Sequence, residues 1–185
     1  MGNAVWESLL YKLVGKVREL KGRAKEPTAA VIDTQSIKTV AGVSEATGYD
    51  GGKKVKGRKR SIATDTQGNI LAVGVSAANL HDTKAAKALQ QDVEDYDKLT
   101  TIFADGAFKG DAPFDKGGKI KWKIVSKKGG PFKVLPKRWV VERSIAWLNN
   151  FRRLTKDYEK NTECSKPMII MAAITITLNK LITCF

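Results

Sequence analysis

The stretch Ala29-Ala30-Val31-Ile32-Asp33 is a short β-prone run that ends on an acid. A second apolar run, residues 98–104, also ends on an acid, Asp105. Between these runs lie two segments, residues 60–64 and 70–76, that flank a turn-rich spacer and predict a β-hairpin. Lysines and apolar residues alternate strictly over residues 119–126, a pattern typical of an edge strand that resists further pairing. These segments predict the strands of a sheet.

The spacing of apolar residues predicts helices over residues 6–20, 83–93 and 137–159, and Pro167 is predicted to open a C-terminal apolar helix. The glycine- and lysine-rich residues 38–59 are predicted to form a loop. This order of elements indicates an α/β fold in which helices flank a mixed central sheet.

The length of 185 residues, of which 42% are hydrophobic, suits one domain with a substantial core. A mean hydropathy of −0.28 is typical of a soluble globular protein. We divide the chain into an N-terminal helical segment that we suspect is truncated, a central domain and a C-terminal packing helix. Their predicted limits are residues 1–26, 27–160 and 161–185.

The chain is strongly basic, with 33 Lys and Arg residues against 19 acids and a net charge of +14. Between Lys116 and Lys156 there are thirteen basic residues and one acid, Glu142. Such a tract favours a polyanionic partner, and nucleic acid is the first to consider because phosphate neutralisation releases counterions.

An anionic membrane is the rival partner. The longest apolar run, residues 168–178, is shorter than the roughly 20 residues of a spanning helix, and the N-terminus does not resemble a signal peptide. The two cysteines, Cys164 and Cys184, lack CxxC spacing and suit a reducing compartment. We therefore expect a cytoplasmic protein without a membrane partner.

Three acids are candidates for a metal site. Two strands that end in acids can bring Asp33 and Asp105 together, and the helix beside them can add Glu142. On that helix Glu142 shares a polar flank with Arg138, four residues earlier, and Asn149, seven residues later. Hard cations such as Mg²⁺ (or Mn²⁺) prefer oxygen ligands, and two such ions form a phosphoryl-transfer centre. An acid at the end of a strand is more often a cap or turn residue, so the trio alone is weak evidence.

Three segments resemble the acidic motifs of bacterial insertion-sequence DDE transposases. They are residues 31–38 (VIDTQSIK), 103–106 (FADG) and 139–143 (WVVER). The resemblance covers nearly the whole chain and is closest to the insertion-sequence group numbered five, related to the group numbered four. Residues 152–159 (RRLTKDYE) and the pair His81-Asp82 support it.

The resemblance implies a ribonuclease-H-like fold and DNA transposition, a form of DNA recombination that begins with endonuclease cleavage. It implies that Asp33, Asp105 and Glu142 bind the metal ions, and Arg138 matches the family's arginine four residues before the glutamate. The chain departs from the family signature at two positions, with Leu135 in place of a tyrosine and Asn149 in place of a basic residue.

The resemblance also implies partners. These are double-stranded DNA, as transposon terminal inverted repeats and target DNA, and a second copy of the chain, because transposition pairs two ends. Family members carry a further N-terminal DNA-binding region, so we expect that a separate polypeptide supplies it. Two alternatives are a metal-dependent nuclease of the same fold and an inactive DNA-binding remnant of a transposase.

Several basic residues are predicted to contact DNA phosphates, although a charge run is usually a solvated face. Glu142 could instead form a surface ion pair with Arg138 or Arg143, and Trp139 could stack on a base. His81 could do acid–base work with Asp82, or Asp82 could simply cap a helix. The predicted DNA-binding residues are Lys53, Lys54, Lys56, Arg58, Lys59, Arg60, Lys121, Lys123, Arg138, Arg143, Arg152 and Arg153.

Overall fold

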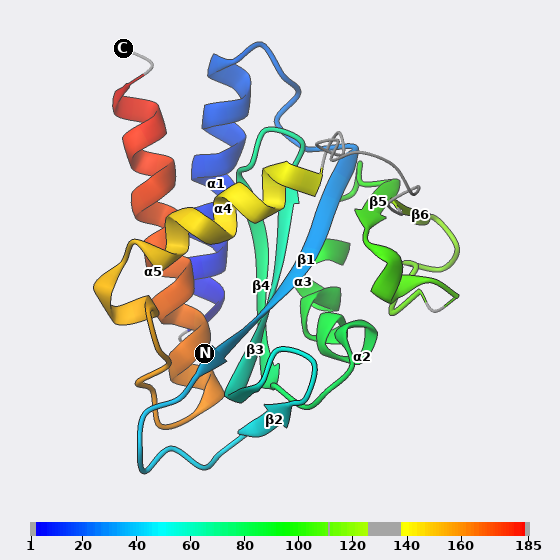
Figure 1. Ribbon diagram of the computed structural model, residues 1–185. Helices are drawn as coiled ribbons and strands as arrows, with labels where there is room; N and C mark the ends of the chain where they lie inside the picture. Colours follow the sequence, from blue (N-terminus) through cyan, green and yellow to red (C-terminus); the bar gives the residue numbers. More distant parts are fainter. Residues whose placement is uncertain (1–2, 111, 126–137, 184–185) are drawn as a thin grey trace, which may run out of the picture.

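A computed structural model describes residues 3–110, 112–125 and 138–183 and shows an α/β fold built on one mixed sheet (Figure 1). The strand order is β2-β3-β1-β5-β6, and β4 also pairs with β3. Strands β1 to β4 are joined by antiparallel pairs, whereas β5 runs parallel to β1 and β6 parallel to β5. The strands are β1 (Ala29–Lys38), β2 (Gly48–Asp50), β3 (Val55–Asp65), β4 (Ile70–Ala77), β5 (Thr101–Ala104) and β6 (Lys121–Ile124).

Helices cover both sides of this sheet. Helix α4 crosses β1 and β3 on one side, and the short helices α2 and α3 lie on the other (Figure 1). Helices α1 and α5 run side by side in the same direction and pack on β4. The helices are α1 (Asn3–Leu20), α2 (Asp82–Ala86), η1 (Lys87–Leu89), α3 (Gln90–Glu94), η2 (Gly106–Phe108), α4 (Arg138–Asn149), η3 (Arg152–Leu154) and α5 (Thr162–Ile182).

The predicted hairpin is confirmed as β3 and β4. Its turn is held by Asp65, whose carboxylate accepts the backbone N–H groups of Gln67 and Asn69, both at 2.9 Å. Gly68 has φ +82°, a conformation that residues with a Cβ rarely adopt. The predicted edge strand is also confirmed, because β6 ends the sheet beside β5.

The predicted helix over residues 137–159 is wrong in length. Helix α4 ends at Asn149, and Phe151 is already extended, with ψ 116°. Two poor helix formers, Asn149 and Asn150, stand at this point. The chain then turns so that Asp157 can bridge to Thr39 beside β1, which a continuous helix could not do. Lys137 lies outside the described residues.

Two other helix predictions also need correction. The segment predicted as one helix over residues 83–93 is divided into α2, η1 and α3. Helix α5 begins at Thr162, not at Pro167, because the Asn161 side chain accepts the Cys164 N–H at 2.9 Å and caps the helix. Pro167 lies within its early turns.

Helix α5 is the one described helix long and apolar enough to cross a membrane by length and composition. Three of its residues, Ile169, Ile170 and Ala173, are fully buried in the core. One such helix is weak evidence for a membrane span, and its packing against α1 and β4 indicates a core helix.

The loop predicted over residues 38–59 contains β2 and the first part of β3, and this corrects three predicted DNA contacts. Arg58, Lys59 and Arg60 lie in β3 and are 0%, 4% and 2% exposed. Lys59 Nζ donates to Asp82 at 2.6 Å, and Arg60 Nη1 donates to the Leu154 carbonyl at 2.9 Å. These cations are therefore bound inside the protein, where a DNA phosphate cannot reach them.

Arg58 joins β3 to the segment before α5. Its Nη1 lies 3.2 Å from Asp157 Oδ1, and both side chains are fully buried. Its guanidinium also donates to backbone carbonyls of Glu45, Glu159 and Lys160 at 2.8, 2.8 and 3.1 Å. A buried charge is tolerated only when it is paired and hydrogen-bonded, as here.

Replacing Arg58 by Ala should therefore lower the free energy of unfolding by about 3–5 kcal/mol, because it leaves Asp157 buried without its counter-charge. Urea unfolding followed by circular dichroism measures this loss. Lys56→Ala, at an exposed position of the same strand, should stay within about 0.5 kcal/mol of the parent. Equal stability of the two variants would contradict the role assigned to Arg58.

Candidate active site

Asp33 lies within β1 rather than at its end, because β1 continues to Lys38. On one side β1 stays paired with β3, where Asp33 is opposite Ile62. On the other side the parallel pairing with β5 covers only Ala29 to Val31, opposite Thr101 to Phe103. Asp33 is therefore just beyond the point where β5 leaves β1.

Asp105 directly follows β5. Its carboxylate accepts the Ala107 N–H at 2.9 Å and caps the short helix η2. Continuing the β1–β5 register by two residues brings Asp105 opposite Asp33. The charge of Asp105 acts on Asp33, in keeping with the predicted closeness of the two acids. Of the two strands, however, only β5 ends at its acid.

The environment of Asp33 raises its pKa from 3.8 to about 6. Burial is the largest cause, and the charge of Asp105 adds to it. A hydrogen bond from the Thr34 N–H at 2.8 Å and the positive charges of Arg138 and Lys53 act in the opposite direction. The Lys53 ammonium is held near Asp33 because it donates to the Thr34 carbonyl at 3.2 Å.

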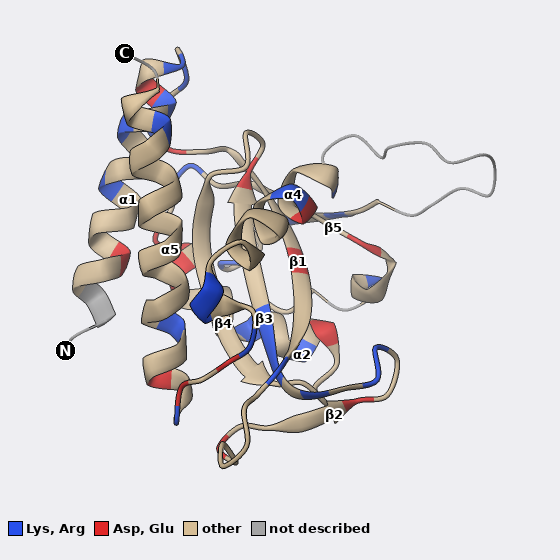
Figure 2. Ribbon diagram, turned by 60° about the vertical axis from the view of Figure 1, so that its left-hand side comes forward, with Lys and Arg blue, Asp and Glu red and all other residues tan. Residues whose placement is uncertain are grey.

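Glu142 reaches the site from α4, and Arg138 connects it to the strand acids. Arg138 Nη2 lies 3.2 Å from Glu142 Oε1 and 3.8 Å from Asp105 Oδ2. The Glu142 side chain is 52% exposed, so its carboxylate can change rotamer. Helix α4, which carries Glu142, packs against β1, which carries Asp33 (Figure 2).

The donor chemistry of this site fits Mg²⁺ or Mn²⁺, because a hard cation uses one or two carboxylates and completes its shell with water and phosphate. Asp33 and Asp105 supply such a pair. Across residues 3–110, 112–125 and 138–183, however, no group of three His, Cys, Asp or Glu residues is close enough to hold a metal ion. Glu142 is paired with Arg138 instead.

Helix α4 is positioned by the β3–β4 turn. Ser144 Oγ donates to the Gly68 carbonyl at 3.0 Å, and Arg143 Nη2 donates to the Gln67 carbonyl at 3.2 Å. The Arg143 guanidinium also lies 4.4 Å from the Trp139 ring centroid and 4.9 Å from that of Trp147. This placement gives Arg143 a structural role and argues against its predicted contact with DNA.

The other predicted DNA-binding residues lie on the surface. Lys53, Lys54 and Lys56 are exposed around the β2–β3 turn. On the edge strand β6, Lys121 and Lys123 are exposed.

After α4, Arg152 is exposed and Arg153 donates to Glu159 at 2.9 Å. These exposed cations remain candidates for phosphate contact.

A groove of about 370 Å³ follows the second half of β1 toward the end of α4. Gln35 Nε2 donates across it to Asn149 Oδ1 at 3.2 Å. Asn149 stands where the family signature has a basic residue, and it is tied to β1 two residues beyond Asp33. Sequence reasoning missed this contact, although the position of Gln35 inside the first acidic motif was a signal. The other departure, Leu135, lies outside the described residues.

His81 is exposed at the N-cap of α2, where its Nδ1 lies 3.0 Å from Thr83 Oγ1. Asp82 pairs with Lys59, so it does not orient His81 toward a reaction.

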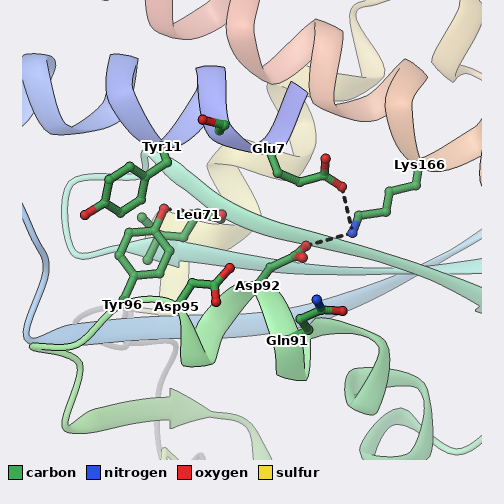
Figure 3. A pocket seen from close by; sticks show the side chains of 9 residues that line it. Glu7, Tyr11, Leu71, Gln91, Asp92, Asp95, Tyr96 and Lys166 are labelled. Carbon is green, nitrogen blue, oxygen red and sulfur yellow. Dashed lines mark hydrogen bonds and ion pairs between the residues drawn. The ribbon is translucent and has the colours of Figure 1, made fainter. Parts of the chain in front are cut away.

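A larger cavity, of about 650 Å³, lies between α1, α3 and α5 (Figure 3). Its polar centre is Lys166, whose Nζ is 3.0 Å from Glu7 and 2.8 Å from Asp92. None of the predicted site residues lines it. We interpret these ion pairs as links between the three helices, and this cavity is not the candidate active site.

The raised pKa of Asp33 predicts a stability effect that depends on pH. Since the folded-state pKa lies above 3.8, ionised Asp33 destabilises the fold, and this cost develops as the pH rises from about 4 through 6. Asp33→Asn should therefore stabilise the protein at pH 8 by about 2 kcal/mol, after allowance for solvent screening, and by little at pH 4. Urea unfolding at both pH values measures this difference.

Asp97→Asn is the matched control, because the Asp97 side chain is 89% exposed. It should show no comparable gain at pH 8. A gain from Asp33→Asn that is the same at pH 4 and pH 8 would contradict the raised pKa.

Comparison with known proteins identifies the family of this chain. The family model described as transposase DDE domain matches residues 24–177, a span that includes Asp33, Asp105 and Glu142. A search of curated proteins found no match. Because the family match covers most of the 185 residues, the chain belongs to the transposase DDE domain family.

Proposed function

We propose that this chain is the catalytic domain of a bacterial insertion-sequence transposase that cleaves and joins DNA strands. The observation that carries the proposal is the meeting of Asp33 and Asp105 beside a helix that presents Glu142 through Arg138. Membership of the transposase DDE domain family supports transposition as the function class. The insertion-sequence group numbered five remains the proposed subgroup.

The sheet supports a ribonuclease-H-like fold for this domain. Three antiparallel strands, β4, β3 and β1, are followed by the parallel strands β5 and β6, with helices on both sides. In this arrangement Asp105, directly after β5, follows the strand that pairs with the first part of β1, and Asp33 lies just beyond that pairing. We propose that residues 27–160 form the catalytic unit.

Asp33 and Asp105 would hold Mg²⁺ or Mn²⁺, and Glu142 would complete the set after a change of rotamer. Two ions bound there would activate a water or 3′-hydroxyl and stabilise the leaving oxygen. The chain's own residues position the DNA. Lys53 is fixed beside Asp33, and the exposed lysines of the β2–β3 turn can neutralise neighbouring phosphates.

The biological setting is part of the same proposal. The substrates are transposon terminal inverted repeats and target DNA, bound by two copies of the chain so that both ends are present. A separate polypeptide would supply recognition of the end sequence. We place these events in the bacterial cytoplasm, on the nucleoid.

Two alternatives remain open. A nuclease of the same fold would cut DNA without joining it. Two observations favour an inactive DNA-binding remnant. Glu142 pairs with Arg138, and no group of three acids that could hold a metal exists among the described residues. The experiments below separate these readings.

The direct test is cleavage and joining of labelled DNA by the purified chain in Mg²⁺. Glu142→Gln keeps the shape of the side chain and removes its charge, so we expect activity to fall at least about a hundredfold. Glu163→Gln is the matched control, because Glu163 is exposed on α5 and outside the site.

Joined products from the parent chain would select the transposase over the nuclease. Binding of DNA without any cleavage, equal in both proteins, would favour the inactive remnant.

The exposed lysines predict a change in the salt dependence of DNA binding. Replacing Lys53, Lys54 and Lys56 together by Ala should reduce the slope of log affinity against log salt by about 2–3, because roughly one counterion is released for each phosphate contact. Fluorescence anisotropy with a labelled duplex at several salt concentrations measures this slope.

A triple variant that replaces the exposed residues Lys12 and Lys16 of α1 and Lys21 directly after it removes the same charge from another surface. An equal loss in the two triple variants would show that net charge, and not the β2–β3 turn, determines binding.

A further inference from the structure

Among the residues that the structure describes, Arg138 interacts with all three acids of the candidate site. Its guanidinium is 3.2 Å from Glu142 and 3.8 Å from Asp105, and its charge acts on Asp33. Arg138 is 21% exposed, whereas Glu142 is 52% exposed. The arginine is thus the less exposed partner of a pair whose acid has freedom to move.

A guanidinium at this position balances negative charge that would otherwise be repulsive. Carboxylates that cluster without a counter-charge disfavour one another's ionised forms. A divalent cation bound by these acids would need Asp105 Oδ2 and Glu142 Oε1, the carboxylate oxygens that now face Arg138. The guanidinium and the metal ion therefore compete for one set of ligands.

We propose that Arg138 is a resident counter-ion of the three carboxylates, which it leaves when divalent cations bind, so that its guanidinium becomes free to contact a DNA phosphate. This inference rests on the proposed function, because it requires the acids to bind metal. It assigns Arg138 two successive partners, carboxylate first and phosphate second. A guanidinium suits both partners, because a carboxylate and a phosphate each present two oxygens to its planar fork of N–H donors.

The exchange couples metal binding to DNA binding. Without cations, Arg138 is occupied and Glu142 is turned toward it. With cations bound, the carboxylates are satisfied and Arg138 adds one contact to DNA. Each ligand should then strengthen binding of the other by the same factor, as linkage requires.

The first experiment measures Mn²⁺ binding to the full chain without DNA, by electron paramagnetic resonance of the free ion. Arg138→Gln removes the competitor and should tighten Mn²⁺ binding roughly tenfold. Arg138→Lys keeps a positive charge and should remain near the parent. Lys109→Gln, which removes the same charge from an exposed residue after η2, should change affinity by less than about twofold.

Glu142→Gln separates the failure of this inference from the failure of the proposed function. If Glu142→Gln weakens Mn²⁺ binding and Arg138→Gln does not tighten it, the counter-ion role is refuted and the metal site stands. If Asp33→Asn, Asp105→Asn and Glu142→Gln all leave Mn²⁺ affinity unchanged, the metal site itself is refuted. An equal gain in Arg138→Gln and Lys109→Gln would show a general charge effect and refute the exchange.

A second measurement uses the unaltered chain, in case a variant fails to fold. The Arg138 Nε–H signal in a nitrogen-correlated NMR spectrum should shift in a saturable manner as Mg²⁺ is added, because the guanidinium changes partner. A signal that does not move at saturating Mg²⁺ would overturn the proposal.

The coupling itself is measured by binding of a labelled DNA duplex with and without Ca²⁺. The gain in DNA affinity that Ca²⁺ gives to the parent should fall at least about tenfold in Arg138→Gln, the worth of one charge-assisted contact. If Ca²⁺ increases the DNA affinity of Arg138→Gln as much as that of the parent, Arg138 does not exchange its carboxylate partners for a phosphate.

Discussion

The buried carboxylate of Asp65 is the constraint on which the arrangement of helices depends. It lies at the β3–β4 turn, accepts two backbone N–H groups of that turn, and pairs with Arg18 of α1 at 2.5 Å. With its own oxygens satisfied, Asp65 holds the turn in a shape that leaves the carbonyls of Gln67 and Gly68 free to accept from other elements. Ser144 of α4 uses the Gly68 carbonyl, and so does Lys180 of α5, at 3.0 Å each.

This turn connects stability to the active site. Helix α4 carries Arg138 and Glu142, and its contacts with the turn decide where these two side chains lie relative to β1. A Cβ at residue 68 would be 3.0 Å from Ser144 Oγ and 3.1 Å from Arg143 Nη2, so a side chain there would crowd both contacts with α4. The strand acids need no such support, because Asp33 is placed by β1 and Asp105 follows β5 directly. Glu142 is therefore the acid whose position depends on the contacts between α4 and the β3–β4 turn.

Positive charge in this protein has two separate uses. Some basic residues are internal partners of acids and carbonyls, as Arg58 is for Asp157 and Arg18 for Asp65. Others, such as Lys54 and Lys56, are exposed and available to phosphate. The net charge of +14 includes both groups, so it overstates the surface that DNA can use. The same division explains why Arg58, Lys59 and Arg60 are buried although Lys54 and Lys56, in the same run of basic residues, are exposed.

The sequence by itself determined the α/β class, the hairpin, the edge strand and the three candidate acids, because these depend on alternation, turn chemistry and short motifs that are local in the chain. It did not determine that α4 stops at Asn149, that Asp33 lies inside a strand, or that Arg58, Lys59 and Arg60 are buried. Each of these follows from partners far away in sequence. They are Asp157 beside β1, Ile62 on β3, Asp82 for Lys59, and the carbonyls before α5 for the two arginines. Only the tertiary structure decided which charges face one another, since burial and pairing arise when distant segments pack together.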